Sequence, residues 1–446
     1  MTTTIRIFKS STEARETILK RQPLDQIEVT PAIAAGIQRI FGETLTPAQV
    51  VERILADVRE QGDAALRDYT KRIDGVELAA LAVSDGEIEA AWHDTPLELR
   101  KALELAAGRI RQFHEREPRD SWMDWREGEA YGQIVRPLAR VGIYVPGGTA
   151  PLPSSLLMAA IPARVAGVSK IVVCSPPGKD GQLSPVILAA ARVAGVDRVF
   201  KVGGAQAIAG LAYGTESIPQ VDKIVGPGNL FVVLAKKAVF GVVDIESLPG
   251  PTETLLIADD SADPAWVAAD LLAQSEHIMG SSILLTPSAE LAEATQREIE
   301  RQLPALRWRE SIAEALDANG GIVIVRELDE AVDLANDYAP EHLCLLTRDP
   351  WALVGRIRNA GGIFVGEASS EALGDYIAGP SHIMPTDGTA RFASPVHVRD
   401  FLKVTSIINA SLSAHNQVAP AAVRLAEAES LTAHAEALRK RLEVGD

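Results

Sequence analysis

The chain of 446 residues is poor in cysteine, in long apolar runs and in basic charge. Its only two cysteines, Cys174 and Cys344, make a disulfide framework unexpected and fit a reducing cytoplasm. Because no uncharged apolar run reaches about 18 residues, we expect no membrane-spanning helix. The first 20 residues lack the apolar core of a secretory signal. With 60 acidic against 44 basic residues, the net charge of −16 disfavours nucleic acid as a partner, since phosphate contacts need a basic face.

The remaining composition is that of a soluble globular protein, with 47% hydrophobic and 23% charged residues, and the length allows more than one domain. After residues 1–45, which show little periodicity, a helix is predicted from Pro47, with Thr46 as its cap, and a second helix after a Thr95 cap. Short apolar strands followed by glycine turns and helices then alternate in two series. The strands of the first series are 141–145, 170–174, 198–202 and 223–225, and those of the second are 282–286, 321–325, 343–347 and 363–365. This alternation predicts parallel sheets, which bind ligands at the carboxyl ends of their strands.

The glycine-rich turns after the first strands indicate a nucleotide site only in part. Gly226 and Gly228 begin a dinucleotide-binding pattern, but Phe231 stands where the third glycine belongs. For any one of these loops taken alone, a tight turn between strand and helix is the more common explanation.

A polar group at the end of a predicted helix suggests a metal site. The helix begins with Asp263 as N-cap and Pro264 in its first turn, and Gln274 and His277 would share one face at its end. An amide oxygen and an imidazole can start a metal site, although a solvated helix end is the more common origin of such a pair.

Three further motifs contain carboxylate and imidazole side chains that could take part in catalysis or metal binding. Adjacent Glu341 and His342 offer two proton acceptors before a strand, and histidine is the usual general base near neutral pH. Asp375 lies in a glycine-rich loop that ends at His382. The C-terminal helical region holds Glu429 and His434, whose spacing of five is only roughly co-facial.

In their order and spacing these motifs resemble histidinol dehydrogenase, from about Thr44 to Leu442. The matching segments are short and are individually weak but jointly specific: 144–149, 202–208, 226–229, 250–253, 273–277, 340–343, 374–382 and 431–434. The resemblance implies a zinc- and NAD-dependent enzyme of histidine biosynthesis. It would oxidise L-histidinol through L-histidinal to L-histidine with two NAD, whereas the residues themselves do not distinguish NAD from NADP.

The resemblance also implies roles for individual residues. Each subunit would hold one zinc through four ligands: Gln274, His277, Asp375 and His434. Glu341 and His342 would be the acid–base residues. The substrate would contact the zinc ligands together with Thr252, Glu341, His382 and Glu429. NAD would contact Tyr144, Gln206 and Asn229.

The implied architecture is an intertwined homodimer of α/β subunits with two incomplete Rossmann-like domains and a mainly helical C-terminal segment. His434 would reach the site of the other subunit. The expected divisions are a small N-terminal arm at 1–31, a discontinuous first domain with the metal motifs at 32–142 and 254–395, a second domain with the NAD loops at 143–253, and a dimerisation segment at 396–446.

The zinc ligands that the resemblance implies agree with an open, substrate-binding metal site, but two other functions and another reaction route stay open. The four ligands would form a weak, open zinc site suited to extra substrate ligands. The same scaffold could instead oxidise another small alcohol, such as a sulfonated diol, and a zinc-bound structural or ligand-binding module without turnover is a third hypothesis. A thiohemiacetal at Cys344 is a rival route to the acid, but a cysteine in an apolar strand is usually inert.

Overall fold

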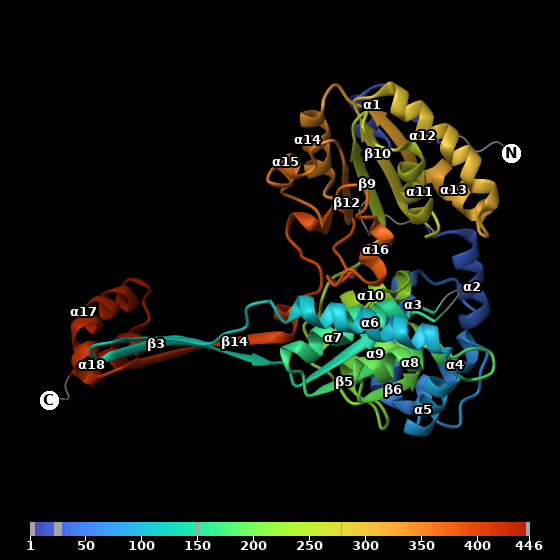
Figure 1. The fold of residues 1–446 in the computed structure, drawn as a ribbon. Coiled ribbons are helices and arrows are strands. Elements are labelled where there is room, and N and C mark those ends of the chain that lie inside the picture. The colour runs from blue at the N-terminus through green and yellow to red at the C-terminus, as the bar shows by residue number, and fades with distance from the viewer. Residues whose placement is uncertain (1–4, 22–28, 148–150, 278, 443–446) are drawn as a thin grey trace.

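The computed structural model describes residues 5–21, 29–147, 151–277 and 279–442. These residues form two α/β domains and an arm that projects away from both (Figure 1). Every strand pair in the sheets of the two domains is parallel. The predicted α/β class with parallel sheets and a helical C-terminal segment is therefore confirmed.

The first sheet has six strands in the order β1-β11-β10-β9-β12-β13. Their bounds are β1 (Ile7–Phe8), β9 (Glu253–Ala258), β10 (Ser281–Thr286), β11 (Gly320–Ile324), β12 (His342–Leu346) and β13 (Gly362–Val365). Every residue of β9 and β12 is buried, as expected for strands covered by helices on both sides. One face packs against α11 (Pro264–Gln274), α12 (Ala289–Gln302) and α13 (Arg309–Asn319), and the other packs against α1 (Ser11–Glu16), α14 (Leu328–Tyr338) and α15 (Trp351–Val354).

The second sheet has five strands in the order β6-β5-β4-β7-β8. Their bounds are β4 (Arg140–Tyr144), β5 (Lys170–Ser175), β6 (Arg198–Lys201), β7 (Lys223–Val225) and β8 (Asp244–Ile245). One face packs against α3 (Pro47–Gln61), α4 (Asp63–Ile73), α9 (Gly204–Tyr213) and α10 (Leu230–Val239), with Ile37 of α2 (Pro31–Phe41) at the margin. The other face packs against α5 (Asp85–Asp94), α6 (Leu97–His114), α7 (Pro153–Ala166) and α8 (Pro185–Ala194).

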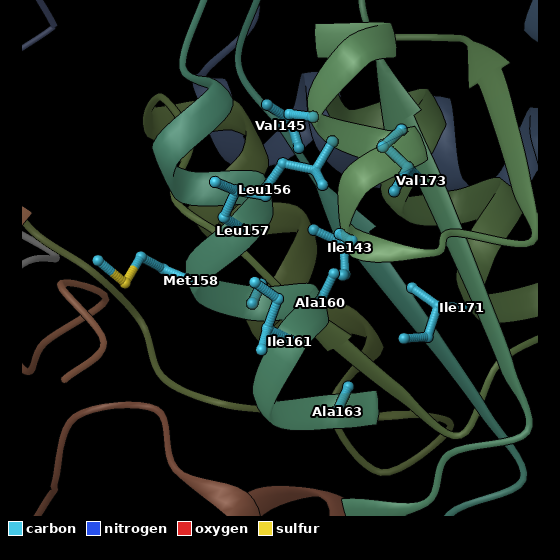
Figure 2. Close-up of a cluster of buried hydrophobic side chains, with 14 of the residues drawn as sticks. Ile143, Val145, Leu156, Leu157, Met158, Ala160, Ile161, Ala163, Ile171 and Val173 are labelled. Carbon is cyan, nitrogen blue, oxygen red and sulfur yellow. The ribbon is translucent and has the colours of Figure 1, made fainter. Parts of the chain in front are cut away.

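Helix α7 lies at the centre of the hydrophobic core that α5, α6, α7 and α8 form with the second sheet. Figure 2 shows Leu156 and Ile161 of α7 beside Ile143 of β4, all of them fully buried. Burying such an aliphatic side chain stabilises the fold by about 1.5–3 kcal/mol. The packing fixes the start of α7, which lies near the site described below.

The arm is built from an antiparallel sheet and two helices. The sheet has the order β14-β3-β2, with β2 (Trp122–Arg126), β3 (Glu129–Pro137) and β14 (Leu402–Ala410), and continues into α17 (Leu412–Ala428) and α18 (Thr432–Leu442). Its own core is small and consists of Val423, Ala426, Ala435 and the partly buried Leu438. Within the described ranges, no helix combines the length and apolarity needed to span a lipid bilayer.

Two local predictions from the sequence have different outcomes. The Thr46 cap forms at the start of α3 as predicted, in a capping box with Gln49. Thr95, predicted to cap the next helix, instead ends α5. Its hydroxyl donates to the carbonyl of Ala91 at 2.7 Å, so it is already used by the preceding helix.

The packing also differs from the domain division expected from the sequence. Residues 1–31 were expected to form an arm, but β1 pairs with β11 at the edge of the first sheet. Residues 32–142 were expected in the first domain, whereas α3 packs on α9 and α10, α5 on α8, and α6 on α7. These helices cover the second sheet because their apolar faces complete its two cores.

Candidate functional site

The acid–base candidates lie where β9 and β12 begin, side by side. Because the two strands are parallel, with His342 paired to Thr254, the residues before them are brought to one edge of the sheet. This is the amino edge of the first sheet. The predicted acid–base residues of this domain therefore lie at the edge opposite the carboxyl ends, where parallel sheets commonly bind ligands.

Glu341 is buried and held through a single carboxylate oxygen. Its Oε2 accepts a hydrogen bond from the Thr252 hydroxyl at 2.6 Å and from the Glu253 backbone N–H at 2.9 Å. Burial raises the pKa of Glu341 to about 7, although the charge of His342 opposes the rise. The carboxyl group can thus exchange a proton near neutral pH. Thr252 donates this hydrogen bond to Glu341, and its contact with substrate stays a prediction.

His342 is buried, and its two ring nitrogens have different surroundings. Nδ1 lies 3.1 Å from the Glu253 carbonyl oxygen, which suits an N–H on this nitrogen. Nε2 faces an Asp375 carboxylate oxygen at 3.5 Å. Burial alone would lower the pKa of His342, but the nearby carboxylates raise it well above the ordinary value. Because Nδ1 is engaged, Nε2 is the nitrogen at which a proton is gained or lost, and the raised pKa favours its protonated form.

Helix α16 (Glu371–Tyr376) brings two carboxylates to His342. Single ligand atoms of His342, Glu371 and Asp375 lie within 4.8 Å of one another, which is close enough to hold a metal ion. Glu371 is buried, accepts a hydrogen bond from the Thr254 hydroxyl and has its pKa raised by burial to about 7. Sequence analysis missed Glu371, although its position four residues before Asp375 on a helix was an available indication.

The end of α11 places Gln274 and His277 differently from the prediction. The Asp263 cap is confirmed, but the helix ends at Gln274, so His277 lies in the following turn and the two do not share a helix face. Gln274 is fully buried, and neither atom of its amide has a hydrogen-bond partner among the described residues. Desolvation lowers the pKa of His277 and Asp375 opposes this, which favours the neutral, metal-binding imidazole.

His382 connects this edge to the second domain. Its Nδ1 lies 2.8 Å from the Asp375 backbone oxygen, and its Nε2 lies 3.0 Å from the hydroxyl of Ser155 in the first turn of α7. The neighbouring Ser381 hydroxyl donates to the Met158 carbonyl at 3.1 Å. The loop is thereby attached to α7, and Ser155 is a contact that sequence analysis did not identify.

The predicted NAD residues lie at or after the carboxyl ends of strands in the second sheet: Tyr144 ends β4, and Gln206 and Asn229 follow β6 and β7. The Tyr144 hydroxyl accepts from the Gly204 N–H at 3.2 Å, and the Asn229 side chain caps α10. The amide of Gln206 is buried without a hydrogen-bond partner in the described part of the chain. Gly226 has φ of 125°, and a Cβ there would lie 2.1 Å from the Tyr144 carbonyl, so the loop needs glycine. Gly148 and Thr149 of the predicted motif lie outside the described residues.

Glu429 and His434 do not join these residues within one chain. Both are exposed on the arm, His434 in α18 and Glu429 at the end of α17. Figure 1 shows this helical end of the arm far from β12 and α16. Of the four predicted zinc ligands, His434 is therefore remote from the acid–base residues within a single chain.

Cys344 lies in the middle of β12, fully buried between Leu256 and Phe364 of the neighbouring strands. Burial raises the pKa of its thiol well above the ordinary value. A thiol held protonated is a poor nucleophile, so the geometry agrees with a packing role.

Comparison with known proteins identifies close relatives. A family model described as histidinol dehydrogenase matches residues 39–442. The histidinol dehydrogenase of Deinococcus radiodurans is 57% identical, over 96% of this chain and 98% of that protein. That of Caldanaerobacter subterraneus subsp. tengcongensis is 52% identical, over 88% of this chain and 92% of that protein. The crystal structure of histidinol dehydrogenase from Elizabethkingia anophelis superimposes with a TM-score of 0.89 at 34% identity and covers 98% of each chain.

Proposed function

The chain belongs to the histidinol dehydrogenase family, and from this premise we propose that it oxidises L-histidinol twice at a zinc site completed by a second copy of the chain. The activity is that of an NAD-dependent oxidoreductase of histidine biosynthesis. The observation that carries the mechanism is the buried Glu341–His342 pair at the amino edge of the first sheet, opposite Asp375.

In the first oxidation His342, in its neutral form, removes the proton of the substrate hydroxyl while a hydride leaves the adjacent carbon for NAD. Its Nε2 is the acceptor because Nδ1 is engaged by the Glu253 carbonyl. The product is the aldehyde. In the second oxidation Glu341 removes a proton from water as the water adds to the aldehyde carbon, and a second hydride leaves for NAD. A raised pKa near 7 makes Glu341 a suitable base.

The donor set supports zinc held by Gln274, His277, Asp375 and His434 of the partner subunit. The amide of Gln274 is buried and lacks a hydrogen-bond partner among the described residues, as a group directed at a ligand would be. When bound, zinc would hold the imidazole and amine of histidinol and offset the Asp375 charge. One zinc per subunit follows from one such set per chain.

A different donor set, His342 with Glu371 and Asp375, is also compact enough for a metal. We favour the first set for two reasons. Glu371 is already bonded to Thr254 in the interior. His342 would lose its role as a base if its Nε2 were bound to the metal. Asp375 belongs to both sets.

The arm supports a homodimer with shared sites. Monomers rarely expose large contiguous apolar patches. Several large apolar side chains of the arm are nevertheless exposed: Trp122, Trp125, Val404, Ile408, Val418 and Leu425. Docking on a second chain would cover these side chains and could carry His434 and Glu429 of the partner subunit to the site. We also propose a cytoplasmic location, which the free, buried thiols of Cys174 and Cys344 support.

The function is tested by following NADH absorbance after adding L-histidinol and NAD to purified protein. Two NADH per histidinol, with histidine as product, are expected. Sulfonated diols serve as competing substrates, and their preferential oxidation would refute the proposed substrate. No NADH with any of these alcohols would refute the enzymatic proposal.

A further inference from the structure

Arg21, near the N-terminus, makes an unusually dense set of contacts beside the candidate site. Its guanidinium binds both carboxylate oxygens of Glu253, and it stacks on the Tyr338 ring at 3.6 Å from the ring centre. It also donates to the carbonyls of Tyr338 at 2.6 Å and Ala339 at 3.4 Å. Only 26% of the Arg21 side chain and 5% of the Glu253 side chain are exposed.

Glu253 is the residue whose backbone holds both acid–base groups. Its N–H donates to Glu341 Oε2 at 2.9 Å, and its carbonyl oxygen lies 3.1 Å from His342 Nδ1. A movement of Glu253 would therefore displace the water-activating carboxylate and rotate the imidazole together.

The other contacts of Arg21 are with the turn that precedes Glu341 and His342 in the chain. Tyr338 ends α14, and Ala339 follows with a positive φ of 52°, a strained conformation for a residue with a side chain. Glu341 comes two residues later. Arg21 thus binds the beginning of β9 through Glu253 and the turn before β12 through two carbonyls.

We propose that Arg21 is a positioning residue of the active site, which clamps the start of β9 to the turn before β12 and so aligns Glu341 with His342. The inference rests on the proposed roles of these two residues. It gives the N-terminal segment a function in catalysis, although Arg21 lies outside the residues that the family model matches.

The first test is the double variant Arg21→Met with Glu253→Gln. Removing both charges avoids leaving an unpaired buried carboxylate, so the fold should persist. We expect kcat for histidinol to fall about 10- to 100-fold, since small misplacements of catalytic groups have effects of this size. KM, bound zinc and the melting temperature should change little, because the lost alignment acts in the transition state.

A chemical rescue and a matched control sharpen the test. Methylguanidinium at low millimolar concentration should restore part of the lost kcat in Arg21→Ala, because the side chain it replaces is partly open to solvent. Arg15 lies on the same segment and pairs with Asp337 of α14 at 2.7 Å, but both side chains are about half exposed. Arg15→Ala should keep the unmodified kcat, with or without methylguanidinium.

Unmodified kcat in a folded Arg21→Ala variant would overturn the proposal. A loss of kcat in proportion to lost zinc would overturn it too, because Arg21 would then support the metal site. Failure of the proposed function is distinguishable, since the unmodified chain itself would form no NADH from histidinol.

Discussion

Replacing Glu341 by glutamine should separate the two oxidations. The side chains have the same size, and the amide oxygen of glutamine can accept the bonds that Thr252 and Glu253 now donate to Oε2. The amide nitrogen would then occupy the place of Oε1, where it cannot take a proton from water. Only the base is removed, so oxidation of supplied L-histidinal should slow while the first hydride transfer from histidinol changes little.

The expected loss can be expressed as a barrier. General bases contribute about 10²- to 10⁴-fold, which corresponds to about 3–5 kcal/mol at about 1.4 kcal/mol for each factor of ten.

Replacing Glu341 by glutamine should also stabilise the fold. Because the pKa of Glu341 rises from 4.5 to about 7 on folding, the native state binds more protons than the unfolded state between these pH values. Stability is therefore lost as pH rises through this window, and glutamine should recover up to about 3 kcal/mol above pH 7.

Single-turnover stopped-flow measurements with histidinol and with histidinal measure the two steps, and thermal unfolding at pH 6 and pH 8 measures the stability. The gain in melting temperature should be larger at pH 8. If Glu341→Gln oxidised histidinal as fast as the unmodified enzyme, Glu341 would not be the water-activating base, and His342 would become the first choice for both steps.

Three further predictions address the metal, the dimer and the thiol. His277→Ala should lose zinc by elemental analysis whereas Glu371→Gln should keep it; the reverse result would assign the metal to the His342–Glu371–Asp375 group. Mixing His277→Ala with His434→Ala dimers under subunit exchange should restore activity, because one hybrid site receives both lesions and the other none; exchange without recovery would exclude shared sites. Cys344→Ser should keep most of its activity and lose about 1–3 kcal/mol of unfolding free energy, since a hydroxyl is then buried in an apolar strand; inactivity in a folded variant would reinstate the thiohemiacetal.

The sequence by itself determined the features that depend on neighbouring residues. The caps at Thr46 and Asp263 form as predicted, because their hydrogen bonds join groups only two or three residues apart. The alternation of apolar strands and helices likewise predicted both parallel sheets. The motifs also indicated which side chains could carry the proposed chemistry, because the sequence gives the identity of every residue.

Only the tertiary structure decided which of these groups meet. The central strand β9 and the residue Glu371 became evident through packing, and α11 ended at Gln274 rather than continuing to His277. Arg21 and Glu253 are 232 residues apart, and no local pattern joins them. Parallel strand register and burial bring such residues together, and both depend on the free energy of the whole packed chain rather than on the preference of any short segment.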